Sequence, residues 1–283
     1  MLKAIRAIHL SLIQAYYLML SEKLWKLHTI MGKILFVLFS FIYLSSYAQT
    51  THNQESWWDY LNQNRYSDKW GSWLDIQLRL NDDFVQAKNE GEYTAGASYF
   101  AKSKFKYTGA LTYIDGYPNS AHINHTKEFR PWAMVQLNTT NHYSKWMQWI
   151  RVEERIRETA QNRIPTGEFD MNTRLRYQVL AQFPLTAHKY EKGSISFVTS
   201  EEIYLNFGKN IVYNRFDQNR FFLGFFYYLS RSNILQLGYT NLYLKNNAPN
   251  KYVKSDVLRI SVFNTIDFRP AKQESKHKLL ETM

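Results

Sequence analysis

Apolar and polar residues alternate with a period of two along most of the chain beyond residue 57. Between residues 74 and 80, every even position is leucine or isoleucine, whereas the odd positions are Asp75, Gln77 and Arg79. Successive side chains of a β-strand point to opposite faces, so the alternation predicts strands with one apolar and one polar face. These strands are expected at about residues 57–66, 69–80, 92–102, 105–114, 127–140, 146–157, 171–183, 194–206, 218–229, 233–245 and 254–268.

The predicted strands pair into hairpins whose connections differ in length. Tight links are expected near residues 67–68, 103–104, 143–145 and 230–232. Longer polar loops are expected near residues 81–91, 115–126, 158–170, 207–217 and 246–253. Short turns at one end and long loops at the other are typical of outer-membrane β-barrels.

The segment WIRVEERIRE, residues 149–158, fits a helix as well as a strand. As a helix it aligns Trp149, Val152 and Ile156 on one face. As a strand it places four charged side chains on one face, namely Arg151, Glu153, Arg155 and Arg157. The neighbouring segments all alternate with period two, and this context favours a strand.

The length of the predicted strands separates a membrane barrel from a soluble sandwich. Most span about 10–14 residues, whereas soluble strands usually have about five or six and a membrane-crossing strand needs roughly 9–11. We therefore expect an all-β fold, a transmembrane antiparallel up-and-down β-barrel. Because single-chain bacterial barrels have an even strand number, about 10–12 strands are expected. Either residues 57–66 lie outside the wall, giving ten, or one further strand gives twelve.

Aromatic residues make up 17% of the chain, with 21 Tyr, 18 Phe and 8 Trp. Several flank the predicted short turns, where a membrane barrel carries an aromatic girdle at the lipid–water interface. The residues expected in this girdle are Trp70, Trp73, Trp146, Trp149, Tyr227 and Tyr228.

The N-terminal region contains a second possible start at Met31. Lys33 and the apolar run 34–44 precede Ser46-Tyr47-Ala48, the pattern of a secretory signal peptide cleaved after Ala48. The expected division is a mis-assigned extension at 1–30, a signal peptide at 31–48, the barrel at 49–268 and a polar C-terminal tail at 269–283. The predicted location is the outer membrane.

Composition excludes several classes of protein. The chain has no cysteine, which excludes disulfides and thiolate metal sites. Its mean hydropathy of −0.45 excludes a helical membrane protein, but a barrel exposes only alternate residues to lipid. The net charge is +11, yet nucleic acid is a poor partner for an exported protein, and none is predicted.

Strand parity places many charged side chains on the predicted inner face. They are Arg79, Glu128, Arg130, Arg151, Glu153, Arg155, Arg174, Arg176, Glu202, Arg220, Arg259 and Asp267, and Asp75 joins them. Two interpretations stay open. These residues form an arginine–carboxylate ladder that fills a narrow barrel, or they form a basic constriction that passes or binds small anions.

The corresponding functions are a narrow porin-like channel or anion-binding pore, and a structural or interaction barrel acting through its extracellular loops. A lipid-modifying enzyme is the third class, but no catalytic residues are predicted. The histidines downstream of residue 48, namely His52, His122, His125, His142, His188 and His277, fall outside the predicted strands. His122 and His125 alone make a weak metal signal, so neither a metal nor a cofactor is expected.

Five segments in order resemble a known family. They are EFRPWAMVQL (128–137), WIRVEERIR (149–157), TRLRYQ (173–178), SEEIYLNF (200–207) and the segment 216–244, which begins FDQNRFFLGFFYYL and ends LQLGYTNLYL. Together they resemble an uncharacterised family of exported barrels from Bacteroidetes-type bacteria, the domain of unknown function number 2490. Over roughly residues 55–268, the resemblance implies an outer-membrane β-barrel and no particular reaction. The partners expected for such a protein are outer-membrane lipid, the barrel-assembly machinery and a small anionic solute.

Overall fold

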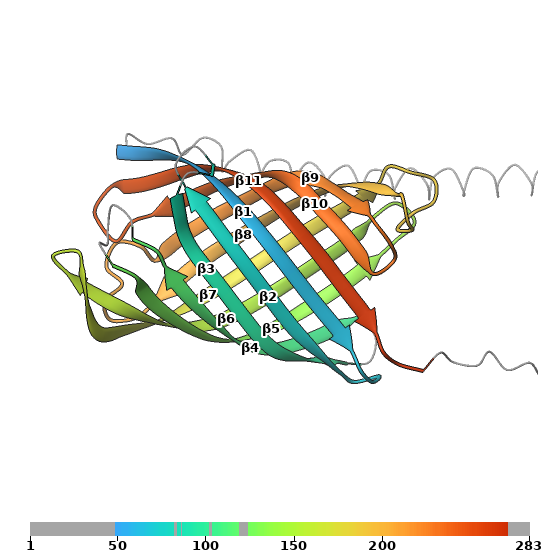
Figure 1. The fold of residues 1–283 in the computed structure, drawn as a ribbon, viewed down its shortest axis with the longest axis horizontal. Coiled ribbons are helices and arrows are strands. Elements are labelled where there is room, and N and C mark those ends of the chain that lie inside the picture. Colours follow the sequence, from blue (N-terminus) through green and yellow to red (C-terminus); the bar gives the residue numbers. More distant parts are fainter. Residues whose placement is uncertain (1–48, 82–83, 86, 102–103, 119–123, 271–283) are drawn as a thin grey trace, which may run out of the picture. The chain divides into compact units, whose positions relative to one another are not determined.

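Each segment with period-two alternation forms a β-strand in the computed structural model, including residues 149–158 (Figure 1). The strands are β1 (Gln49–Arg65), β2 (Trp70–Asn81), β3 (Ala87–Phe100), β4 (Phe105–Gly116), β5 (Thr126–Thr140), β6 (Lys145–Gln161), β7 (Ile164–Pro184), β8 (Ile195–Phe207), β9 (Phe216–Tyr228), β10 (Asn233–Lys245) and β11 (Lys251–Asp267). The structure describes residues 49–81, 84–85, 87–101, 104–118 and 124–270. The predicted extension, the signal peptide and the tail beyond residue 270 lie outside these residues.

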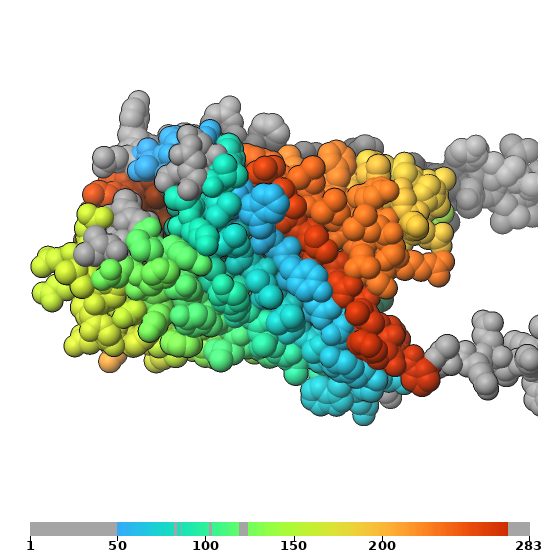
Figure 2. All heavy atoms as spheres, in the orientation of Figure 1, coloured from blue at the N-terminus to red at the C-terminus, as the bar shows by residue number. Residues whose placement is uncertain are grey.

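The eleven strands close into one barrel, in which every neighbouring pair is antiparallel except β1 and β11. These two run parallel in continuous register, from Gln49 opposite Lys251 to Arg65 opposite Asp267. Figure 2 shows β1 in blue beside β11 in red across one face. The predicted even strand number is therefore wrong. Residues 57–65 belong to the wall as part of β1. An odd number of strands can close because the parallel ladder between β1 and β11 pairs the backbone groups of both edge strands, as an antiparallel ladder would.

The predicted loop at residues 158–170 is also replaced by strand. β6 and β7 continue past the rest of the wall and meet at Asn162 and Arg163, whose φ angles are 53° and 70°. Two successive positive φ angles define the tight hairpin turn whose twist matches that of the flanking strands. The polar composition of this segment indicated a loop, whereas it forms the tip of a long hairpin.

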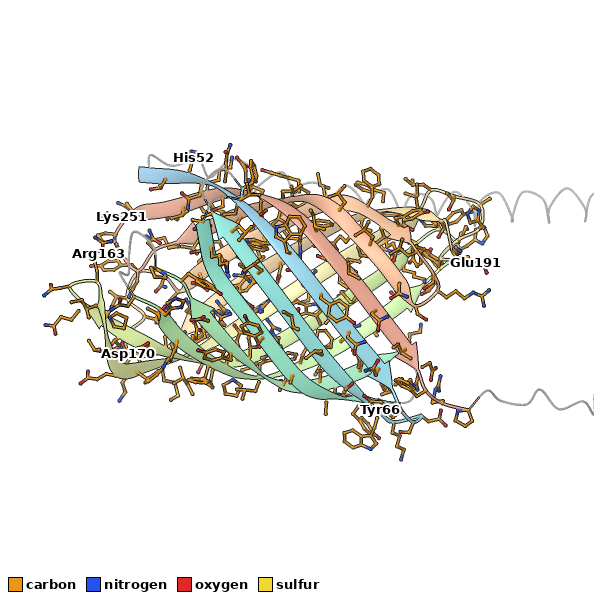
Figure 3. The ribbon with its side chains drawn as sticks, in the orientation of Figure 1. His52, Tyr66, Arg163, Asp170, Glu191 and Lys251 are labelled. Carbon is orange, nitrogen blue, oxygen red and sulfur yellow. The ribbon has the colours of Figure 1, made fainter. Side chains whose placement is uncertain are left out.

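The barrel has two distinct ends, which Figure 3 marks with labelled residues. Tyr66 and Glu191 lie at the turn end, where the connections are 66–69, 101–104, 141–144, 185–194 and 229–232. Arg163 and Lys251 lie at the loop end, where the connections are 82–86, 117–125, 162–163, 208–215 and 246–250.

Polar side chains face the inside of the barrel and apolar ones face outward. In β5, Glu128, Arg130 and Trp132 are buried inside, whereas Phe129 and Val135 are exposed on the outer surface. This arrangement reverses that of a soluble barrel, which buries its apolar face. Within the described residues, no helix is long and apolar enough to cross a membrane.

Side chains from strands that are not neighbours in the wall meet inside the barrel. Trp73 of β2 packs edge-on against Trp132 of β5, with ring centroids 6.0 Å apart. Lys106 of β4 donates to Gln63 of β1 at 2.7 Å. The inside also contains apolar clusters, one of Val198, Phe222, Phe226 and Tyr228 and another of Trp132, Met134 and Trp149. Side chains therefore project into the barrel and contact one another across two intervening strands at these levels.

Candidate functional site

Glu153 of β6 is the centre of a buried charge network in the lumen. Only 1% of the residue is exposed, and three guanidinium groups surround its carboxylate. Arg174 binds it directly, while Arg151 and Arg176 approach it at 3.2 and 3.3 Å. Arg174 and Arg176 lie on β7, directly beside β6, so strand parity brings all four side chains to the inner face.

Glu128 of β5 is shared in the same way by two arginines. Its two oxygens accept from Nε and Nη2 of Arg130 at 2.6 and 3.0 Å. The same atoms of Arg155 donate at 2.6 and 3.1 Å. Each guanidinium thus forms the two-pronged bond that its planar geometry favours, and a lysine would not reproduce it.

Four further carboxylates complete the network. They were not among the predicted lumen charges. Arg79 pairs with Glu90 at 2.6 Å and Glu92 at 2.5 Å. Arg259 pairs with Asp59 at 2.9 Å, and Arg174 pairs with Asp217 at 3.0 Å. Glu90 fell in a predicted loop. Asp217 likewise fell in the predicted loop 207–217. Glu92 began a predicted strand, and Asp59 lay in the segment whose place in the wall was left open, so only the correct strand bounds and register could have identified these carboxylates.

Most of the predicted lumen charges do meet in this network, and the exceptions are Asp267, Asp75 and Arg220. Arg176 also binds Glu202 at 2.5 Å, which links β7 to β8. Asp267 instead lies exposed at the end of β11, where it binds Arg269 at 2.6 Å. Asp75 faces the lumen but accepts from Gln77 at 3.1 Å and forms no salt bridge within the described part of the chain.

Three lumen cations toward the loop end form no salt bridge with any described residue. Arg220 of β9 lies between the rings of Trp57 and Tyr204, 4.7 Å from each centroid, and its buried Nε has no hydrogen-bond partner within the described part of the chain. Arg157 donates to the Asn172 amide oxygen at 2.8 Å. Lys245 donates to the carbonyl oxygen of Ala248 at 2.5 Å. Arg157 and Lys245 were not among the predicted lumen charges.

Guanidinium groups and aromatic rings alternate around the lumen in what we call the aromatic–guanidinium stack. It runs through Arg79, Trp57, Arg220, Tyr204, Arg176, Trp149, Arg151 and Trp132, with group-to-ring distances of 4.4, 4.7, 4.7, 4.4, 5.3, 5.5 and 4.6 Å in that order. A cation over a ring face is attracted by the ring quadrupole, and the attraction grows where water is excluded. Each ring of the stack except the last contacts two arginines. The rings therefore link arginines from β2, β9, β7 and β6.

The predicted aromatic girdle divides according to strand parity. Trp70, Trp146 and Tyr227 are exposed on the outer face near the turns. Trp73, Trp149 and Tyr228 instead point into the lumen, where Tyr228 accepts from Gln182 at 2.7 Å. Each pair lies one or three residues apart, so its members must face opposite sides of a strand. Proximity to a turn does not determine on which face of the strand a residue lies. Trp73, Trp149 and Tyr228 therefore do not belong to an outer girdle.

A cavity of about 340 Å³ lies inside the loop end and contains all three unpaired cations in its lining. Other cations that line it, such as Arg79, Arg155 and Arg174, are held by carboxylates. Its lining also includes Trp57, Glu55 and Leu242. This cavity is the candidate functional site, because uncompensated positive charge is concentrated there.

Metal ligands do not gather anywhere in the described residues, where no group of three or more His, Cys, Asp or Glu side chains could hold an ion. His125 lies 3.0 Å from Asp115 through its Nδ1 atom. His122, the other histidine of the weak metal signal, lies outside the described residues.

Comparison with known proteins agrees with the resemblance in the sequence. A family model described as "Protein of unknown function (DUF2490)" matches residues 54–253. The chain belongs to the DUF2490 family. The matched region begins in β1 and ends in β11, so the DUF2490 region contains all or part of every strand of the barrel wall. Among curated proteins and solved structures, none matches the chain.

Proposed function

We propose that this DUF2490 protein is an outer-membrane β-barrel that binds a small anionic solute in its lumen and does not conduct it. The observation that carries this proposal is the set of three cations without carboxylate partners, Arg157, Arg220 and Lys245, around one cavity. The expected surroundings are outer-membrane lipid, and the expected folding partner is the barrel-assembly machinery. No chemical step is part of the proposed function.

Membrane embedding is supported by the outer surface of the wall. Leu111, Ile150 and Leu237 lie on three different strands, and each is 52% exposed. Soluble proteins rarely expose contiguous apolar surface on this scale, whereas a lipid-facing wall requires it. The strands have 12 to 21 residues, long enough to cross the hydrocarbon core of a bilayer when tilted.

Anion binding is supported by the balance of charge inside the barrel. A buried ion is costly unless it is paired, and most lumen arginines satisfy this requirement with a neighbouring carboxylate. Arg220 has no carboxylate partner among the described residues and contacts two aromatic rings instead. A solute with a negative group would supply the missing counter-charge for Arg220 and its two neighbours in the cavity lining.

Binding is favoured over conduction by the packing below the cavity. The aromatic–guanidinium stack and the apolar clusters occupy the lumen between the cavity and the turn end. Trp73 and Trp132 meet across it. An ion that enters from the loop end would therefore meet packed side chains, and a small barrel leaves little free bore in any case.

Isothermal titration of the purified protein with glutarate tests the proposal, with neutral glutaramide as the reference solute. We expect glutarate alone to bind, and Arg220→Gln to weaken its affinity at least tenfold. The matched control is Arg231→Gln, which removes an exposed arginine paired with Glu191 at the turn end and should leave binding unchanged. Absence of anion binding would overturn the proposal.

Conductance in a planar bilayer under a salt gradient tests the second half of the proposal. We expect a silent barrel. Discrete steps with an anion-biased reversal potential would instead identify a pore.

A further inference from the structure

The same cavity contains hydrogen-bond acceptors that an inorganic anion would leave unsatisfied. Glu55 of β1 is 7% exposed, lines the cavity and forms no salt bridge with any described residue. Its carboxylate accepts one hydrogen bond, from the indole Nε1 of Trp57 at 2.9 Å. An ionised carboxylate has room for further donors, and phosphate or sulfate would repel it.

Amide side chains form the rest of the polar lining. They are Asn89, Asn214, Gln218, Asn246 and Asn247, which come from β3, β9 and two loops at the loop end. The Asn214 amide oxygen is buried and has no hydrogen-bond partner among the described residues. Asn247 already accepts from the Tyr213 N–H at 3.2 Å and donates to the Asn210 carbonyl at 3.2 Å. A side-chain amide carries two N–H donors and an acceptor, and this is the combination that binds hydroxyl groups, which also donate and accept.

From these groups, and building on the anion-binding function above, we propose that the ligand is a small hydroxylated organic acid of the sugar-acid class. Its carboxylate would bind among Arg220, Arg157 and Lys245. Its hydroxyl groups would donate to Glu55 and exchange hydrogen bonds with the amides. The cavity volume of about 340 Å³ lies near the lower limit of roughly 300–1,000 Å³ for small-molecule sites, which suits a single sugar unit.

The charge of the lining also distinguishes a sugar acid from other small solutes. Three unpaired cations face one unpaired carboxylate, so a neutral sugar leaves the cations uncompensated. A simple dicarboxylate has no donor for Glu55. A zwitterionic amino acid supplies one donor group but no set of hydroxyls for the five amides.

Calorimetric titration of the purified protein with four probes tests this assignment: glucuronate, glucose, glutarate and glutamate. Glucuronate is expected to bind at least tenfold more tightly than each of the others. Glu55→Gln retains the side-chain shape and should weaken glucuronate at least fivefold while changing glutarate affinity less than twofold. Arg220→Gln should weaken both ligands, and Arg231→Gln neither. Comparison of the four probes on the unaltered protein does not depend on any variant folding.

The outcomes separate the two proposals. If glutarate binds as tightly as glucuronate, the anion site stands and the sugar-acid assignment falls. Tightest binding of glutamate would assign a zwitterionic ligand and overturn the sugar acid. Equal binding of glucose and glucuronate, or no binding of any probe, would overturn both.

Discussion

At the scale of single residues, the contribution of a buried charge depends on whether it has a partner of opposite sign. Glu153 is the clearest case, because three arginines converge on its nearly inaccessible carboxylate. Removing one member of a buried ionic group leaves the remaining charges desolvated without compensation, which costs about 3–5 kcal/mol.

Glu153→Gln is therefore expected to lower the free energy of unfolding by about 3–5 kcal/mol. Urea unfolding of the folded barrel in detergent or lipid measures this change. Glu191→Gln is the control, since Glu191 binds only the exposed Arg231 and a surface pair contributes about 1 kcal/mol at most. Equal stability of the two variants would show that the network does not stabilise the barrel.

Arg174 and Arg220 provide a matched comparison between a paired and an unpaired arginine. Arg174→Gln removes the partner of both Glu153 and Asp217 and should destabilise the barrel by about 3–5 kcal/mol. Arg220→Gln breaks no salt bridge with any described residue and removes a buried charge that lacks a counter-ion there, so the loss of its two ring contacts should destabilise the barrel less than Arg174→Gln does. If Arg220→Gln proved the more damaging, Arg220 would be a structural residue and not a ligand-binding one. Urea midpoints of the two variants give the comparison.

At the scale of elements, the junction of β1 and β11 determines how the wall closes. A hydrogen-bonded row of amides crosses it on the outer face. Asn62 donates to Asn264 at 2.5 Å, and Asn264 donates to Asn233 of β10 at 2.6 Å. Because each amide is bound by the next, a shift in the register of β1 would leave several of them unsatisfied. The row thus favours one register at the parallel junction.

Cross-linking tests this junction directly, since the chain has no native cysteine. Tyr60 lies opposite Val262 in the parallel register. The double variant Tyr60→Cys with Val262→Cys should be joined rapidly by a short thiol-reactive cross-linker, as seen by mass spectrometry. Tyr60→Cys with Ile266→Cys is the control, because four residues of offset add about 13 Å along the strands. Preferential cross-linking of the control would indicate a different closure.

At the scale of the whole barrel, the reversed polarity of the wall predicts its surroundings. Trp58, Trp70 and Trp146 are exposed on the outside, whereas Trp57, Trp73, Trp132 and Trp149 belong to the lumen. Only the outer group would contact lipid tails in the proposed membrane.

Brominated lipids should therefore quench part of the tryptophan fluorescence of the reconstituted protein. Replacing Trp58, Trp70 and Trp146 by phenylalanine should abolish most of this quenching, because the lumen tryptophans lie behind the wall. Replacing Trp73 by phenylalanine serves as the control and should leave the quenched component in place. Absence of quenching in the unaltered protein would contradict membrane embedding.

Local sequence was sufficient for the strands and for their two faces. Residues 74–80 and 174–178 alternate so regularly that the polar side must face one way along the whole segment. This is a consequence of backbone geometry, since a strand turns successive side chains by half a revolution. For the same reason, parity places Trp70 and Trp73 on opposite faces of β2. The predicted girdle included both because each lies near a turn, and nearness to a turn does not indicate a face.

The closure of the barrel and the pairing of its charges depended on tertiary structure. Asp59 and Arg259 are 200 residues apart in sequence, and they meet only because β1 and β11 are neighbours. Alternation specifies on which face a charge lies but contains no information about which distant strand lies opposite. The sequence by itself therefore determined long strands with a charged inner face. The odd strand number, the partners of each arginine and the isolation of Arg220 were decided by register, which is a property of the closed wall and not of any one strand.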